Sequence, residues 1–508
     1  MSTTVKSDAS CEPGRRVIEA ARHAPALRQP GRRARCPVAI ALMLSLAACV
    51  RYEPRPLHPA DSARQFSARR LDAPELRTQV QALLPSATTS WPPSRWDRGS
   101  LLAVALAQNP RLAVARSEAR VALAREVAAG VAPNPDLTLQ SEYARDESHS
   151  WLYGIGFDVL LRSSRRRRLD VDIAKLAGAN AQWNVVEQAW AVRRALNAAL
   201  SEWQDASRRG VVLGHVVDSQ ARLAAMQERR IAAGEDAPGS GVAARAALLE
   251  AEQQRAQARS DAGAAQTAVA AALGLPPEAL DGVQPDWPDW GAPPPVDDVL
   301  LRRAGEQALL SRADLAAAIG DYAGAEKQFE RAVARQYPEF HLEPGYYWDH
   351  GIAKWPLDVA FALPIFNRNE GEIAEARAAR DVAAGRMLAL QAQIQGQIAA
   401  ATRAEVVAAQ GAAAAQRRVD AAAEQSRHAE LGLKLGAIDR SERVAAEATA
   451  WRVQLDALQA RARYQDARDA LEDALHVPLS GPELALRPAL QAAAPVDEPA
   501  SSANEAQP

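Results

Sequence analysis

The chain has 508 residues, of which 48% are hydrophobic and only 5% aromatic. Its 60 Lys and Arg residues nearly balance 62 Asp and Glu residues, so the net charge of −2 gives no electrostatic case for a nucleic-acid partner. The cysteines Cys11, Cys36 and Cys49 all lie near the N-terminus, which excludes a disulfide or a cysteine-ligated metal site from the main body.

The first 48 residues have the order of a secretory signal. Arginines between residues 28 and 35 precede a short apolar run, which is only about half as long as a membrane-spanning helix. The run ends in Leu-Ala-Ala-Cys, which resembles the bacterial lipobox, where the cysteine is lipidated and becomes the new N-terminus. We therefore predict a lipoprotein signal peptide over residues 1–48, lipidation of Cys49, for example by palmitate, and a lipidated linker over 49–99. An ordinary signal peptide with a chance cysteine is the alternative.

The rest of the sequence repeats itself. At a shift of 203 residues, Leu112 in NPRLAVA meets Leu315 in RADLAAA, and at a shift of 202 Gly234 meets Gly436. Such self-similarity indicates a duplicated unit. We predict a first repeat over 100–282, a Pro/Trp-rich linker over 283–299, a second repeat over 300–480 and a disordered tail over 481–508.

Each repeat begins with a predicted helix, which in the first repeat covers residues 100–132 and is capped by Ser100. Two segments with alternating apolar residues follow, and this period of two predicts strands with one apolar face. The predicted strands cover about 136–143 and 151–161 in the first repeat, and about 339–348 and 355–364 in the second, with hairpin turns at 144–150 and 349–354.

A long helical tract without internal proline then follows in each repeat, at residues 165–232 and 369–434. At 1.5 Å per residue each tract would span about 100 Å. Each ends at a glycine-containing turn, from which a shorter helix returns to about residue 273 or 475. Four membrane-length strands cannot close a barrel alone, and bacterial outer-membrane barrels need at least eight strands. Several copies must therefore combine, and three would supply twelve strands.

The fold class predicted is mainly α with a small β part: a tandem-repeat long-helix α-barrel plus a transmembrane β-barrel, four strands per protomer, completed by trimerisation. The segments ALAQNPRLAVARSEA and ALPIFNRNEGEIAEARAAR, the two glycine turns and the lipobox followed by YEP resemble the TolC-like outer-membrane efflux proteins. Within that family the chain is similar to lipoprotein members of the resistance-nodulation-division exporters, including the Czc/Cus-type heavy-metal branch. At the end of the second strand, the first repeat has LLRSSRRRR where the second has LPIFNRN.

The resemblance implies a homotrimer whose barrel lies in the outer membrane and whose helices form a tunnel through the periplasm. It would be the passive exit duct of a tripartite pump, with an inner-membrane transporter supplying the energy and a periplasmic adaptor meeting the helical turns. Besides the lipid at Cys49, the chain would contact outer-membrane lipid through its barrel. The resemblance implies no enzyme activity, and the sequence offers no cofactor motif.

The turns at 234–241 and 436–443 are predicted to contact the adaptor and to form the gate, with these candidates: Gly234, Glu235, Asp236, Gly436, Asp439 and Arg440. The glycines also fit a simpler role, ending helices in the left-handed conformation. The run Arg165–Arg168 is predicted to be a solvated or phosphate-facing anchor. His149, His341 and His350 lack ligand spacing, so no metal site is predicted.

Two other functions compete with the duct. A periplasmic adaptor or coiled-coil scaffold lipoprotein would also have a lipobox and long helices, but it would need neither the four strands nor the duplication. An enzyme carried on a helical shell is the other rival, although no catalytic arrangement of residues is recognisable.

Overall fold

The computed structural model describes residues 52–84, 91–93, 95–145 and 148–491. Contacts divide the chain into residues 1–62 and 63–508. The described part of the first unit, residues 52–62, contains the start of helix α2 (Pro59–Ser67). Everything below concerns the second unit, and both Cys49 and the predicted signal peptide lie outside the described residues.

The second unit begins with ordered structure where a linker is predicted. Helix α3 (Pro74–Leu83) buries Leu76 and Val80, which are four residues apart and therefore share one helix face. Strand β1 (Trp96–Asp97) buries Trp96 and pairs in parallel with β4 (Pro285–Asp286). The prediction of a linker up to residue 99 is therefore wrong over this part, because its apolar side chains pack into the core.

The first predicted helix, 100–132, is two helices. α4 (Arg98–Gln108) and α5 (Pro110–Gly130) are separated at Asn109, because Pro110 has no backbone N–H to continue α4. The Asn109 side chain caps α5 by accepting from the backbone N–H of Arg111 at 2.9 Å. The cap of α4 is Asp97, whose carboxylate accepts from the Ser100 N–H at 2.6 Å, so Ser100 is not the cap.

The second repeat contains the same break and the same contact, made by a different residue. Helices α8 (Asp298–Ser311) and α9 (Ala313–Ala334) meet at Arg312. Asn109 donates from Nδ2 to the Ala272 carbonyl at 2.8 Å, and Arg312 donates to the Ala474 carbonyl at 2.7 Å. The duplication is therefore preserved in the structure at a position where the side chains differ completely.

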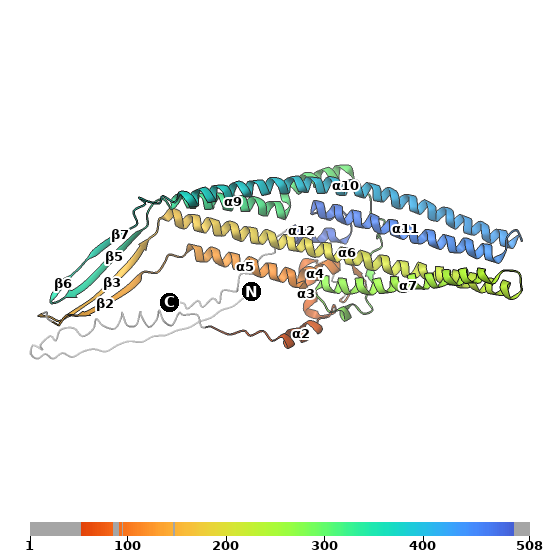
Figure 1. Ribbon diagram of the computed structural model, residues 1–508, viewed down its shortest axis with the longest axis horizontal. Coiled ribbons are helices and arrows are strands. Elements are labelled where there is room, and N and C mark those ends of the chain that lie inside the picture. Colours follow the sequence, from red (N-terminus) through yellow and green to blue (C-terminus); the bar gives the residue numbers. More distant parts are fainter. Residues whose placement is uncertain (1–51, 85–90, 94, 146–147, 492–508) are drawn as a thin grey trace, which may run out of the picture. The chain divides into compact units, whose positions relative to one another are not determined.

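Two long helical hairpins dominate the second unit (Figure 1). They are α6 (Ser164–Ala232) with α7 (Pro238–Leu273), and α10 (Glu370–Lys434) with α11 (Arg440–Leu475). The 69 residues of α6 give it a length of about 100 Å. Among the described residues, no helix combines the length and apolarity that crossing a membrane as a helix requires.

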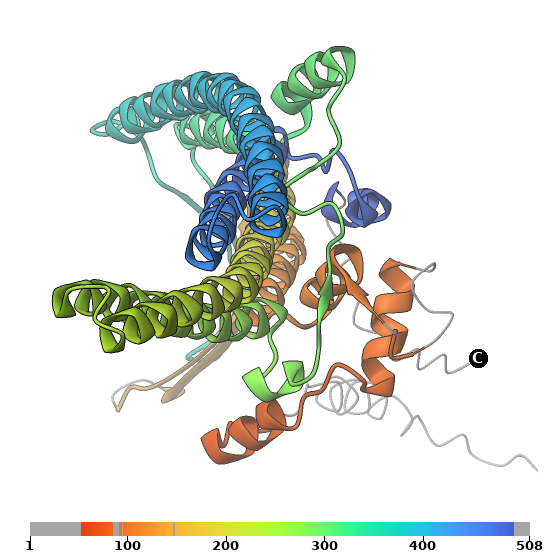
Figure 2. The ribbon, with the colours of Figure 1, turned by 90° about the vertical axis from the view of Figure 1, so that its right-hand side faces the viewer.

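Helix α6 is the shared element of the packing. It contacts α5 and α7 from its own repeat and α9 and α11 from the other repeat, whereas α10 packs along α9 and α11. Viewed along the helices, the two hairpins lie side by side (Figure 2). The strands lie at the opposite end of this unit from the α6–α7 and α10–α11 turns (Figure 1).

The strands at this end form one antiparallel sheet, which is separate from the parallel β1–β4 pair. β2 (Asp136–Tyr143) pairs with β3 (Trp151–Leu161), and β3 pairs with β5 (Phe340–Asp349). The other edge of β5 pairs with both β6 (Ile352–Lys354) and β7 (Leu357–Phe361).

The last strand differs from the prediction. The expected single strand over about 355–364 begins earlier, as β6, and Pro356 interrupts it because proline cannot donate to the ladder. The Pro356 carbonyl still accepts from the Gly345 N–H at 3.0 Å, so β6 and β7 act as one broken strand. The hairpin turn is also shorter than predicted and centres on His350 and Gly351, which both have positive φ.

The segment that connects the repeats belongs to the core. Trp287 and Trp290 are both buried, and Trp290 donates from Nε1 to the Ser201 hydroxyl of α6 at 3.2 Å. The guanidinium groups of Arg98 and Arg208 lie over the rings of Trp287 and Trp290, 4.3 Å and 4.5 Å from their centroids. These contacts hold the connection against the first repeat, and the Gly291 N–H, which donates to the Gln465 side chain of α11 at 3.3 Å, joins it to the second repeat.

The C-terminal segment is ordered further than predicted. The 3-10 helix η3 (Pro482–Leu486) and helix α12 (Arg487–Gln491) bury Leu486 and Leu490 completely. Trp190 of α6 donates from Nε1 to the Leu490 carbonyl at 3.1 Å. The prediction of a disordered tail from residue 481 is therefore wrong over 481–491, and residues 492–508 lie outside the described residues.

A buried cluster of charges ties η3 to three helices. Arg193 of α6, only 1% exposed, donates to the Glu483 carboxylate of η3 at 2.6 Å and also contacts Glu472 of α11. Arg98 of α4 lies 4.0 Å from Glu483 and 3.9 Å from Asp469 of α11. Two arginines and three carboxylates thus meet where the two repeats and the C-terminal segment join.

Replacing Arg193 by methionine should destabilise the chain strongly. Glu472 and Glu483 would then be buried without their main partner, which typically costs about 3–5 kcal/mol. Urea unfolding of the full chain measures the change. The control is Arg194→Met, because Arg194 pairs with Asp473 at 2.7 Å while 53% exposed, and such pairs contribute about 0–1 kcal/mol. Equal losses in both variants would contradict a special role for the buried cluster.

The same cluster makes stability depend on pH through Asp469. Burial raises the pKa of the Asp469 carboxyl to about 7; Arg193 opposes this shift, and Glu472 adds to it. Because the folded state binds this proton more tightly than the unfolded state, the stability that Asp469 contributes is lost as the pH rises toward 7.

Asp469→Asn should therefore reduce this pH dependence. Between about pH 5 and about pH 8, the free energy of unfolding should fall more in the unaltered chain than in the variant, because asparagine stays neutral. Urea titrations at both pH values measure the difference. Asp456→Asn, which changes an exposed aspartate of the same helix, should keep the original dependence. An unchanged slope in Asp469→Asn would show that Asp469 does not titrate in this range.

Candidate functional site: the helical turns and the sheet

The first turn (residues 233–237) ends α6 and begins α7. Gly234 has φ of +76°, and the Glu235 N–H reaches back to the Arg230 carbonyl at 2.9 Å, which closes the helix end. The Asp236 carboxylate accepts from Arg230 at 2.7 Å and from Gln227 at 2.9 Å. These hydrogen bonds, led by that from Arg230, hold the pKa of Asp236 below its usual value.

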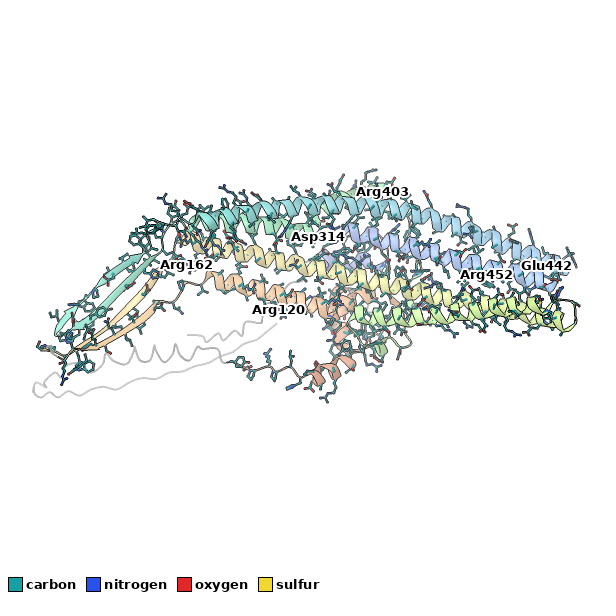
Figure 3. The ribbon with its side chains drawn as sticks, in the orientation of Figure 1. Arg120, Arg162, Asp314, Arg403, Glu442 and Arg452 are labelled. Carbon is teal, nitrogen blue, oxygen red and sulfur yellow. The ribbon has the colours of Figure 1, made fainter. Side chains whose placement is uncertain are left out.

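The second turn (residues 435–439) ends α10 and begins α11. Gly436 has φ of +71°, and the Ala437 N–H donates to the Gly432 carbonyl at 2.8 Å. Asp439 and Glu442 form a reciprocal capping box, in which each side chain accepts from the backbone N–H of the other residue. The hydrogen bond from the Glu442 N–H lowers the pKa of the Asp439 carboxyl. Glu442 is labelled near this turn in Figure 3.

Arg230 brings the two turns together. Its guanidinium binds Asp236 in its own hairpin and lies 3.8 Å from Asp439 in the other hairpin. Further from the turns, Arg222 of α6 binds Glu447 of α11 at 2.7 Å. The sequence analysis missed both arginines, because Asp439 and Glu447 lie in the other repeat and no local spacing reveals these cross-repeat pairs.

The predicted turn residues therefore separate into three groups. Glu235, Asp236 and Asp439 all lie within 4 Å of Arg230. Gly234 and Gly436 fulfil the structural role of ending helices in the left-handed conformation. Arg440 is an exposed residue at the start of α11.

Asp439→Ala should loosen the first turn of α11. Loss of a helix cap costs about 1 kcal/mol, so backbone amides at residues 442–444 should exchange with solvent about fivefold faster. Hydrogen–deuterium exchange of the full chain measures this rate. Arg440→Ala is the matched control, because it alters the next residue and leaves both capping-box hydrogen bonds intact. The same acceleration in both variants would argue against the cap.

The sheet has two chemically different faces. The register places large apolar side chains in line on one face, for example Leu137 opposite Phe157 and Val159 opposite Leu342. Many of them are exposed in the single chain, including Leu139 at 73% and Leu137 at 55%. An exposed apolar face of this extent needs a partner or a lipid environment.

The opposite face carries polar and small residues. His341 lies 3.0 Å from the Asp158 carboxylate, and Glu343 is paired directly with Asp358. The Tyr347 ring covers Gly154, where a Cβ atom would come within 2.1 Å of the ring, so any larger residue there would displace the ring. Within the part of the chain that the structure describes, no group of three or more His, Cys, Asp or Glu side chains could hold a metal ion.

Residues 101–275 match the family model of outer membrane efflux proteins. Among solved structures, the outer-membrane channel OprN shares 17% identity, with a TM-score of 0.63 covering 84% of this chain and 99% of that chain. CusC shares 16% identity, with a TM-score of 0.61 over 75% of this chain and 92% of that chain. The MtrE outer membrane channel of Neisseria gonorrhoeae shares 18% identity, with a TM-score of 0.61 over 75% of this chain and 89% of that chain.

No curated protein matches the sequence. The similarity to CusC is no greater than to the other two channels, so it does not single out the heavy-metal branch. The proteins in these comparisons are efflux proteins and membrane channels rather than enzymes. The predicted resemblance is confirmed: residues 101–275 match the family model of outer membrane efflux proteins, and the chain has the fold of these outer-membrane channels, in which long helical hairpins join a sheet.

Proposed function

We propose that this chain is the exit channel of a tripartite efflux pump, in which three copies form a duct through the outer membrane and the periplasm. The duct conducts passively what an inner-membrane transporter expels. The observation that carries the proposal is the sheet, whose exposed apolar face and unpaired edges a single chain cannot satisfy.

The apolar face has the dimensions of a lipid-facing band. Toward the hairpin turns it begins with aromatic pairs, Tyr153 stacked on Trp348 at 6.4 Å and Tyr346 beside Trp355 at 4.7 Å. Near the helices it ends in a row of Leu161, Phe340 and Phe361. From residue 153 to 161 the strand rises about 27 Å. Strand tilt reduces this to about 21 Å, close to the ~25 Å apolar band between the aromatic girdles of outer-membrane barrels.

The sheet edges supply the reason for several copies. In the described residues, β2 pairs only with β3, and the β6–β7 edge pairs only with β5. The outer backbone groups of both edge strands therefore need partners, because lipid offers none. Pairing β2 of one copy with the β6–β7 edge of the next closes the ladder, and three copies together provide a barrel of ordinary size.

The helices support the same assembly. Helix α10 has 65 residues, yet it buries only Ile394, Ala415 and Ala422. Apolar side chains such as Leu388 and Val407 remain exposed on it. A helix of this length needs lateral packing to be stable, and neighbouring copies would provide it.

The two turns are the proposed contact with the periplasmic adaptor and the proposed gate. They lie at the opposite end of this unit from the sheet (Figure 1), and Arg230 gives each protomer one cation shared by Glu235, Asp236 and Asp439. Widening the space between the hairpins must separate Arg230 from Asp439. Cys49, which lies outside the described residues, remains the proposed lipidation point and would be an auxiliary anchor.

Leu137→Arg tests the membrane role. Leu137 lies opposite Phe157 near the middle of the apolar band, where an arginine facing lipid costs about 2–4 kcal/mol. The variant should insert into lipid vesicles at least about 30-fold less favourably than the unaltered chain. The measurement is the fraction of protein in the bilayer after refolding in the presence of vesicles.

Thr138→Arg is the matched control, because the neighbouring side chain lies on the opposite, polar face of the same strand. It should leave insertion nearly unchanged. Trimers in detergent and ion conductance in planar bilayers should accompany insertion of the unaltered chain. A periplasmic scaffold lipoprotein would tolerate both substitutions equally and would not conduct, which would overturn the proposal.

A further inference from the structure

Four arginines stand in the first turn of α6, directly after β3 ends. Arg165 and Arg166 are paired: Arg165 binds Glu330 at 3.2 Å, and Arg166 binds Glu339 at 2.9 Å. Arg167 and Arg168 are exposed, and neither has a carboxylate within ion-pair distance among the described residues. Two cations therefore remain uncompensated at the start of α6, where the sheet joins the helices; Arg162, which lies just before this helix in the sequence, is labelled in Figure 3.

The fold does not require these arginines. The second repeat makes the same transition from strand to helix with Asn-Arg-Asn-Glu, and the first turn of α10 contains Glu370 and Glu372. The first turn of α6 contains no acidic residue. Cations at the beginning of a helix are unfavourable because that end carries the positive pole of the helix dipole. The first repeat thus holds an unfavourable surplus of positive charge that its counterpart avoids.

The surplus charge lies immediately beyond the apolar band. Leu161 is paired with Phe340, and Phe340 with Phe361, so these residues form the last apolar row before α6 begins. At the same transition in the second repeat, Ile365 and Phe366 are 70% and 99% exposed. Apolar side chains followed at once by unpaired cations match the order of acyl chains and phosphates in a lipid leaflet.

We propose that Arg167 and Arg168 form a binding site for anionic phospholipid headgroups of the membrane leaflet on the helical side of the sheet. The exposed Ile365 and Phe366 would lie in the adjoining acyl region. The inference rests on the proposed membrane insertion and adds a lipid preference to it. Each arginine near an anionic surface strengthens binding about fivefold, so loss of both should weaken the interaction about 30-fold.

The test uses the full chain in detergent, titrated with phosphatidylglycerol or phosphatidylcholine while thermal unfolding is followed. Phosphatidylglycerol should raise the unfolding temperature more than phosphatidylcholine, and added salt should weaken this effect. Arg167→Gln with Arg168→Gln should require about 30-fold more phosphatidylglycerol for half of the effect. Arg417→Gln with Arg427→Gln, which removes two exposed arginines of α10, should behave like the unaltered chain.

Other outcomes would overturn the proposal. If both lipids raised the unfolding temperature equally, the arginines would not select between lipids. The same would follow if both double variants needed the same amount of phosphatidylglycerol for half of the effect. A response to inorganic phosphate alone would indicate a general anion site. A shifted reversal potential in planar bilayers, with lipid dependence unchanged, would place the arginines on the conduction path. If the unaltered chain conducts equally in both lipids, only this inference fails, whereas failure to insert into either would remove the proposed function itself.

Discussion

The burial of Arg193 between Glu472 and Glu483 is the interaction on which the arrangement of the repeats depends. It joins α6 of the first repeat to α11 of the second and fixes the C-terminal segment against both. A buried ion pair tolerates little displacement, because moving one partner away leaves the other charge buried without compensation. The cluster therefore fixes how the two hairpins lie against each other around Arg193. This constrains the sheet at one end of the helices and the two turns at the other end.

The sequence predicted the regular parts of this structure well, because their signals are local. Period-two alternation located β2 and β3, and the proline-free tracts located α6 and α10. The errors occurred where a single residue overrides the pattern. Pro110 divides the first helix, and Pro356 divides the last strand. Both are visible in the sequence, but their effect depends on which backbone hydrogen bond each one removes.

Long-range contacts were beyond local analysis. The C-terminal segment is short and proline-containing, yet it is ordered through Glu483, Leu486 and Leu490, whose partners are almost 300 residues away, for example Arg193 and Trp190. The same is true of Arg230 and Asp439 at the turns. The duplication helps only partly, since equivalent positions keep a contact while changing the residue, as Asn109 and Arg312 do. Sequence similarity between the repeats therefore underestimates their structural similarity.

The open sheet edges have a consequence for a single chain outside the proposed assembly. A newly made chain with two open sheet edges is a template on which other chains could add as strands and form fibrillar aggregates. Pro356 does not remove a donor from the open edge, because its carbonyl accepts from the Gly345 N–H and its backbone nitrogen therefore faces β5. The outward backbone groups of β6 and β7 therefore remain open to a stray strand as well as to a neighbouring copy in the proposed assembly. Assembly and aggregation thus compete for the same edges, and a copy that closes the sheet also removes the surface on which fibrils would grow.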